Sequence, residues 1–205
     1  MSFLEAGDLA AAARTFDSAG VHSAAYRREH PGLAARHRAW GLAQRATVAA
    51  AQNDVPALRL LAESIQVEAA QSAYGRDHTL PTYVRGLILA RTGQRRAAAD
   101  SLRAAIFSPT EGYTRVSSEL ARILLVQGRP GEAIPWLQSA LRGGIEASNY
   151  YLTQTDLHEL LAQCFAAAGM ADSARAHAAW VTRAWERAEP EFAARKQLME
   201  RLATP

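Results

Sequence analysis

One pattern recurs along the chain: an apolar helix, a short turn centred on Gly or Asn, and a second Ala-rich helix. The plainest copy is LARTGQRRAAADSLRAAIFSPT at 89–110, and the pattern returns at 124–144 and 165–181, with weaker copies at 49–65 and 4–20. One such helix pair cannot bury its apolar face alone, so the copies must stack on one another. The repeat therefore predicts an all-α protein.

Positions at fixed distances from the turn carry the same kind of residue in each copy. The turn residue must tolerate a left-handed backbone, and the candidates are Gly7, Asn53, Gly93, Gly128 and Gly169. Seven positions before the turn the residues are small, namely Ala46, Gly86, Ala121 and Ala162. Five positions after it they are Ala12, Leu58, Ala98, Ala133 and Ala174. These mostly small residues would let the two helices approach closely, and larger apolar residues elsewhere would fill the space between copies.

The aligned copies resemble the tetratricopeptide repeat family over nearly the whole chain. The resemblance implies a right-handed α-solenoid of about five helix pairs in a single domain, 1–205. Its segments would be a truncated first repeat at 1–30, repeats at 31–75, 76–110, 111–148 and 149–188, and a capping helix at 189–205.

The copies depart from the family pattern in two respects. Successive turns are 46, 40, 35 and 41 residues apart, against about 34 in the family. The family's Trp eleven positions before the turn is replaced by Leu42, Thr82, Ser117 and His158. The array is therefore a divergent one, with extended helices or connections between copies.

The two ends of the array differ. The first copy starts six residues before Gly7, so most of its first helix is missing, and we expect a fragment or a partner that covers this end. At the other end, EPEFAARKQLMERLATP predicts a capping helix that begins at Pro190. Phe192, Leu198 and Leu202 would cover the last repeat, while Arg195, Lys196 and Glu200 face water.

A finer resemblance is to the C-terminal repeat region of large bacterial regulators, in which such repeats follow a serine/threonine kinase or a DNA-binding activator domain. It is carried by YVRGLILARTG, AAIFSPTEGYTR and the span from ALRGG to AWERAEPEF. This chain holds no kinase motif and no winged-helix pattern.

Composition agrees with a helical globular protein. Of the 205 residues 45 are alanine, which has the best helix propensity. The net charge is only +3, and Lys196 is the one lysine among 23 basic residues that are dispersed among acids. We therefore expect no nucleic-acid partner. The sequence also predicts no membrane span, no signal peptide and a cytoplasmic protein.

The sequence carries few residues or motifs that are typical of a catalytic or metal site. The sequence has no phosphate-binding Gly-rich loop, no HExxH and no GxSxG. The lone Cys164, within a predicted first helix, is expected to be a small buried hydrophobe. The scattered histidines are expected at the surface or at helix caps, and the four Trp are expected to be packing residues. The sequence thus predicts no enzyme, no cofactor and no metal.

The remaining functional class is the binding of a partner at the protein surface. In the resembled family the first helices line a concave groove, and residues ten, thirteen and six before each turn would point into it. These positions hold Trp40, Ala43, Thr47, Tyr83, Leu87, Arg115, Ser118, Arg122, Glu159 and Gln163. Arg115 and Arg122 lie two helical turns apart and would grip a carboxylate or an acidic peptide. The alternative is that these arginines pair with Glu119 and neighbouring acids.

A second surface comes from the longer connections between copies, 74–81, 108–114 and 143–153. They carry Tyr74, Tyr113, Tyr150 and Tyr151, and Tyr is a favoured contact residue. The alternative is that each Tyr covers the end of its own helix pair.

The leading functional hypothesis is a protein–protein interaction scaffold or sensing module that binds a peptide or partner domain in the groove. Arg115, Arg122 and Tyr83 would orient the partner. Two alternatives stay open: an accessory module that contacts an upstream domain of a longer regulator, and a self-assembly element that associates through the exposed first repeat.

Overall fold

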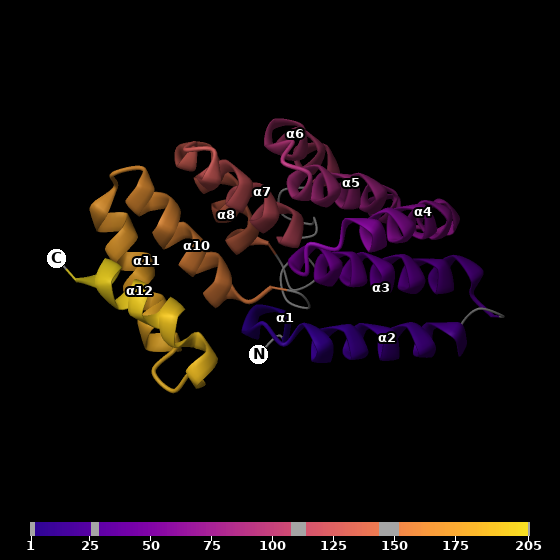
Figure 1. Cartoon of the computed structure of the whole chain (residues 1–205), viewed down its shortest axis with the longest axis horizontal. Helices are drawn as coiled ribbons and strands as arrows, with labels where there is room; N and C mark the ends of the chain where they lie inside the picture. The colour runs from indigo at the N-terminus through magenta and orange to yellow at the C-terminus, as the bar shows by residue number, and fades with distance from the viewer. Residues whose placement is uncertain (1–2, 26–28, 108–113, 144–151, 205) are drawn as a thin grey trace. The chain divides into compact units, whose positions relative to one another are not determined.

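The computed structural model describes residues 3–25, 29–107, 114–143 and 152–204, and every regular element within these ranges is a helix (Figure 1). An all-α fold is therefore confirmed for the described chain. None of its helices is both long enough and apolar enough to cross a membrane. The chain forms two compact units, residues 2–107 and 108–205, where the sequence predicts a single domain.

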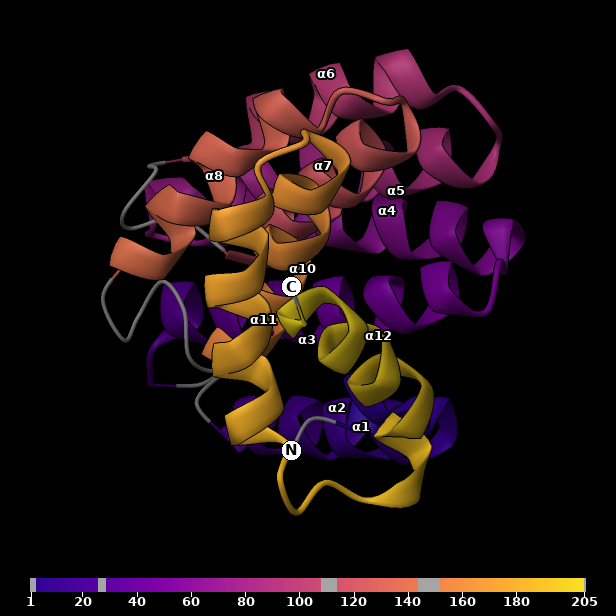
Figure 2. The ribbon, with the colours of Figure 1, turned by 90° about the vertical axis from the view of Figure 1, so that its left-hand side faces the viewer.

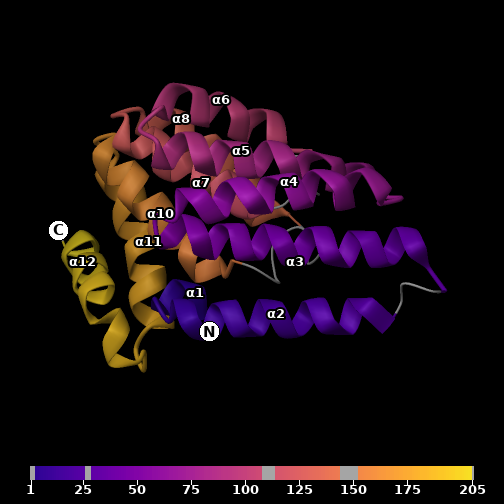
Figure 3. The same cartoon turned by 45° about the vertical axis from the view of Figure 1, so that its right-hand side comes forward.

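The N-terminal unit, residues 2–107, is a series of helices in which each packs on the next (Figure 3). Helix α3 also contacts α5, so the first helices of two successive pairs touch. The elements are α1 (Phe3–Ala6), α2 (Leu9–Ala25), α3 (Pro31–Ala51), α4 (Val55–Gln71), the 3-10 helix η1 (Gly75–Thr79), α5 (Leu80–Arg91) and α6 (Arg95–Ala105).

The C-terminal unit, residues 108–205, repeats this arrangement (Figure 2). Helix α10 contacts α7, α8, α11 and α12, and is therefore the central helix of the unit. The elements are α7 (Thr114–Val126), α8 (Pro130–Arg142), α10 (Gln154–Ala167), α11 (Ala171–Ala184), the 3-10 helix η2 (Pro190–Phe192) and α12 (Ala193–Ala203).

All five predicted turn residues adopt a left-handed backbone. Their φ angles are 84° at Gly7, 58° at Asn53, 80° at Gly93, 70° at Gly128 and 74° at Gly169. After α5, the N–H of Gly93 donates to the Ala90 carbonyl at 3.3 Å and that of Gln94 to the Leu89 carbonyl at 2.9 Å. This is the Schellman pairing that satisfies the last carbonyls of a helix. The same pairing follows α3, α7 and α10, so the predicted turns join consecutive helices at these positions.

The small-residue positions predicted for the helix crossings are buried. Ala46, Gly86, Ala121 and Ala162 are buried, as are the five residues that follow the turns by five positions. At Gly86 of α5 the approach is especially close, since a Cβ atom would lie 2.7 Å from Leu102 Cγ of α6. Only a glycine permits this crossing without displacing a fully buried side chain.

Helix starts follow local chemistry. Pro31, Pro81 and Pro130 lie in the first turns of α3, α5 and α8, where a missing N–H costs nothing. The Asp54 carboxylate caps α4 by accepting from the Ala57 N–H at 3.0 Å. Thr153 and Asp156 form a reciprocal capping box at the start of α10.

The predicted C-terminal helix exists and covers α11 and α10. Phe192 is buried as expected, whereas Leu198 and Leu202 are half-buried and Met199, which the sequence analysis did not name, is fully buried. The expectation that Arg195 faces water is wrong, because its side chain is only 26% exposed and pairs with two carboxylates of α10.

Candidate partner-binding face on helix α10

Helix α10 presents three polar side chains along one face. Asp156, Glu159 and Gln163 are spaced three and four residues apart, which stacks them on consecutive helical turns. Glu159 and Gln163 are two of the predicted groove residues. The two carboxylate side chains are 4% and 7% exposed, so each needs a close partner to stay charged.

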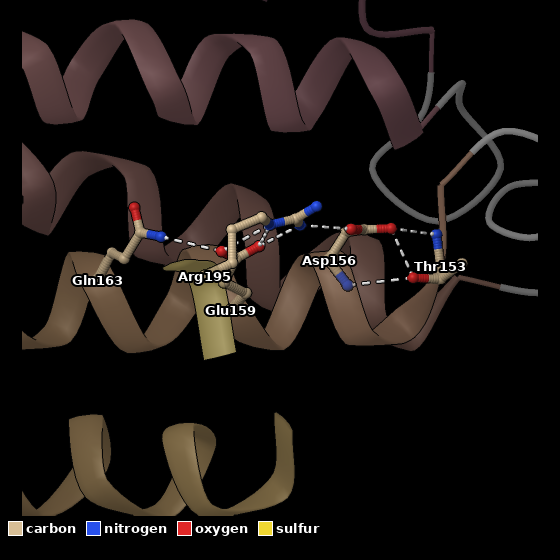
Figure 4. A network of polar contacts seen from close by, with 5 residues as sticks. All are labelled: Thr153, Asp156, Glu159, Gln163 and Arg195. Atoms are coloured by element: carbon tan, nitrogen blue, oxygen red, sulfur yellow. Dashed lines mark hydrogen bonds and ion pairs between the residues drawn. The ribbon is translucent and has the colours of Figure 1, made fainter. Parts of the chain in front are cut away.

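That partner is Arg195 of α12, 36 residues beyond Glu159 (Figure 4). Its Nε donates to Glu159 Oε1 at 3.0 Å, and its Nη2 donates to Asp156 Oδ1 at 2.8 Å and also to Glu159 Oε2. Gln163 Nε2 lies 3.4 Å from Glu159 Oε1, and the Thr153 hydroxyl donates to Asp156 Oδ2 at 2.5 Å. One guanidinium thus joins the two helices through both carboxylates.

The electrostatics of the network favour the charged form of Arg195. Burial by itself would lower the pKa of Arg195, but hydrogen bonds and charge attraction from Glu159 and Asp156 outweigh it and raise that pKa. The partial positive charge at the start of α10 further favours the Asp156 carboxylate. The Arg195 guanidinium also lies 5.0 Å from the Trp185 ring centroid and 5.2 Å from that of Phe192. These aromatic faces stabilise the cation.

The predicted groove residues of α7 are mostly buried. Arg115 and Ser118 are 2% and 1% exposed, and the Ser118 hydroxyl donates to the Arg115 carbonyl within its own helix. Neither offers a contact surface, so the prediction that Arg115 orients a partner is corrected. Arg122, one helical turn further along, is half-buried and retains access.

The predicted groove residues of the N-terminal unit serve its own packing. Tyr83 is fully buried, and its hydroxyl lies 2.8 Å from the Thr47 hydroxyl of α3. Trp40 is half-buried and its indole Nε1 donates to Asp77 Oδ1 at 2.7 Å. These contacts tie α3 to η1 and α5, which corrects the assignment of Tyr83 to partner binding.

The tyrosines of the connections are placed only in part. Tyr113, Tyr150 and Tyr151 lie outside the described residues. Tyr74 is 44% exposed, and the Arg36 guanidinium lies 4.0 Å from its ring centroid. Because Arg36 belongs to α3, which pairs with α4, this contact favours the alternative that the Tyr covers its own helix pair.

The buried carboxylate of Asp77 was not predicted from the sequence. This side chain is inaccessible to solvent and accepts from Trp40 and from the Ser72 hydroxyl, the latter at 2.6 Å. The guanidinium nitrogens of Arg36 and Arg76 each approach it to 4.0 Å. A carboxylate in a connection gives no sequence signal of burial, because two of its partners, Trp40 and Arg36, come from the distant helix α3.

Nucleophilic catalysis and metal sites with three or more protein ligands find no support in the described ranges. No group of three or more His, Cys, Asp or Glu side chains there is arranged to hold a metal ion. Cys164 is fully buried, and burial raises the pKa of its thiol to about 11, so the thiolate is disfavoured.

Comparison of the chain with models of known protein families, with curated proteins and with solved structures gives no match. The face on α10 therefore has to be interpreted from its own chemistry.

Proposed function

We propose that the chain is a tetratricopeptide-like helical-repeat module that binds a protein or peptide partner along its first helices. The observation that carries the proposal is that first helices of successive pairs contact each other directly. Helix α3 contacts α5 in one unit, and α7, α10 and α12 form a contiguous row in the other. Stacked helix pairs of this kind build extended surfaces that suit extended partners.

Within the C-terminal unit we call the surface of α7, α10 and α12 the first-helix face. The accessible polar groups of these helices include Arg122, Gln163 and the partly exposed edge of Arg195. They are placed on helices whose backbones are fixed by buried Leu and Ala side chains, so a partner meets a preorganised surface. Arg122 would take a carboxylate of the partner, and Gln163 would hydrogen-bond its backbone.

A matched pair of glutamines tests the proposal. Gln163 lies on the first-helix face, whereas Gln138 is exposed on the second helix α8. A photo-crosslinking residue is introduced at each position and activated in the cells that make the protein. We expect a discrete cross-linked partner from position 163 and none from position 138. Equal cross-linking from both positions, or none from position 163, overturns the proposal.

Charge reversal then tests the assigned contact with the captured partner. Arg122→Glu should weaken the partner's Kd by about tenfold or more, since it replaces an attraction by a repulsion. Arg142→Glu, on the exposed side of α8, should leave the Kd nearly unchanged. An unchanged Kd for Arg122→Glu removes the first-helix face from the interface.

A further inference from the structure

Two histidines that lie 19 residues apart in the sequence meet between α10 and α11. His158 Nδ1 and His177 Nδ1 are 2.7 Å apart, and the two ring centroids are 4.8 Å apart. Both residues are half-buried, so neither is sealed in the core of the unit. In the metal-free pair one Nδ1 carries a hydrogen and donates it to the other.

Aromatic neighbours fix both ring planes. Trp180 stacks on His158 with centroids 4.1 Å apart and planes inclined by 12°. Phe165 stacks on His177 with centroids 5.3 Å apart and planes inclined by 20°. Each histidine is thus held by a ring from the opposite helix, which limits its rotation and keeps the Nδ1 atoms facing each other.

We propose that His158 and His177 form a two-imidazole binding site for a divalent transition metal ion. This site is independent of the proposed partner-binding function. Metal entry needs no net proton release: the donor ring moves its hydrogen from Nδ1 to Nε2, and both Nδ1 lone pairs then face the ion. The two nitrogens must separate to about 3.3 Å, as metal–nitrogen bonds of 2.0–2.1 Å in a tetrahedral site require.

The ligand type selects the class of metal. Imidazole nitrogens suit Cu(II), Ni(II) and Zn(II), whereas Mg²⁺ and Ca²⁺ need oxygen ligands. The half-buried environment lowers the pKa of both histidines, that of His158 to about 4, so both rings are neutral and available at pH 7. Water would take the remaining coordination positions, and the stability order places Cu(II) first.

Metal titration of the untagged, metal-free full chain tests the site. Cu(II) bound beside Trp180 should quench part of the tryptophan fluorescence in a saturable, one-to-one manner. Zn(II) should raise the melting temperature, because it binds the folded pair and not the separated histidines. His158→Gln and His177→Gln should each weaken Cu(II) affinity by at least about tenfold, since even the loss of a group that only hydrogen-bonds a metal ligand costs about 10–100-fold.

Two controls keep the result decisive. His22→Gln, on the exposed side of α2, should leave both the quenching and the Zn(II) shift unchanged. Electron paramagnetic resonance of the one-to-one Cu(II) complex should show coupling to two imidazole nitrogens in the native chain. This second readout does not depend on how stable the variants are. Equal Cu(II) affinity in the native chain and in both site variants, or a spectrum without two-imidazole coupling, overturns the proposal.

Discussion

At the residue scale, the packing of α5 on α6 depends on Gly86. The missing side chain lets α5 approach α6 until Leu102 occupies the space that a Cβ would need. Alanine occupies the same repeat position at residues 46, 121 and 162, so those helix pairs accommodate a methyl group where the pair of α5 and α6 does not.

Gly86→Ala should destabilise the protein. Overpacking typically costs about 1–3 kcal/mol, which exceeds the roughly 0.5–1 kcal/mol gained from better helix propensity. We expect a net loss of about 1 kcal/mol in urea unfolding. Gly131→Ala is the matched control, because a Cβ there meets nothing within 4 Å, and it should leave the free energy of unfolding equal or slightly higher.

The histidine pair predicts acid sensitivity in the metal-free chain. The folded-state pKa of His158 lies near 4, below its ordinary value of 6.5, because burial and the neighbouring His177 disfavour its charge. The unfolded state therefore binds the proton more readily. The contribution of the neutral His158 ring to the free energy of unfolding is therefore complete above pH 6.5 and is lost as the pH falls toward 4.

Melting temperatures recorded from pH 7 to 4 in the presence of a chelator check this expectation. His158→Gln should show a shallower loss of stability over that window than the native chain, while His22→Gln should follow the native chain. A native profile that is flat between pH 6.5 and 4 contradicts the assignment.

At the element scale, each described helix pair depends on its left-handed turn residue. Four turns use glycine and one uses Asn53, whose φ is 58°. This conformation is sterically unfavourable for an L-residue with a Cβ unless its side chain is short and polar. The turns therefore fix where each first helix ends and where its partner begins.

Gly93→Ala should lower the free energy of unfolding by about 1–2 kcal/mol, because alanine strains the left-handed turn between α5 and α6. Asn53→Gly, the reciprocal change at the equivalent position, should shift it by less than about 1 kcal/mol. Chemical denaturation of both variants measures the difference. Equal destabilisation by the two substitutions would mean that the loss of stability does not come from strain in the left-handed backbone.

Helix α12 is held by one guanidinium as well as by apolar contacts. Arg195→Ala leaves the buried carboxylates of Asp156 and Glu159 without their cation, which should cost about 2–3 kcal/mol. Hydrogen exchange should accelerate most in α12 and at the start of α10. Arg201→Ala, at an exposed position of the same helix, should change neither exchange nor stability.

At the scale of the whole molecule, the chain divides between residues 107 and 108 into two compact units. Each unit has its own buried core: Leu58, Ile65 and Leu102 in the first, and Leu124, Leu137 and Leu161 in the second. Helix pairs that stack on their neighbours gain stability mainly from nearest-neighbour interfaces. A unit that retains all its pairs therefore retains most of its stabilising contacts.

Expressed separately, residues 2–107 and 108–205 should each be helical and unfold cooperatively. A fragment ending at residue 91 lacks α6 and exposes the Gly86 side of α5, so it should lose cooperative unfolding. Circular dichroism during urea titration distinguishes these cases. Loss of cooperative folding in both complete fragments means that neither unit is stable by itself.

The repeat spacing by itself determined the helical class, the five turn positions and the small residues at the helix crossings. These features depend on local backbone conformation and on periodic burial, both of which are encoded by residues close together in the chain. The same helical periodicity predicted that Glu159 and Gln163 share one face of α10.

Only the tertiary structure decided which polar groups meet. In the folded chain Arg195 pairs with Glu159, 36 residues away, and the buried Asp77 accepts a hydrogen bond from Trp40. His158 contacts His177. Tyr83 and Arg115 are buried and do not lie at the surface. Helical periodicity predicts which face of a helix a residue occupies. The partner of a polar side chain depends instead on how helices that are distant in the sequence pack together. Those contacts between distant helices, and not the repeat, determine where this protein carries charge, neutral imidazole and exposed hydrogen-bonding groups.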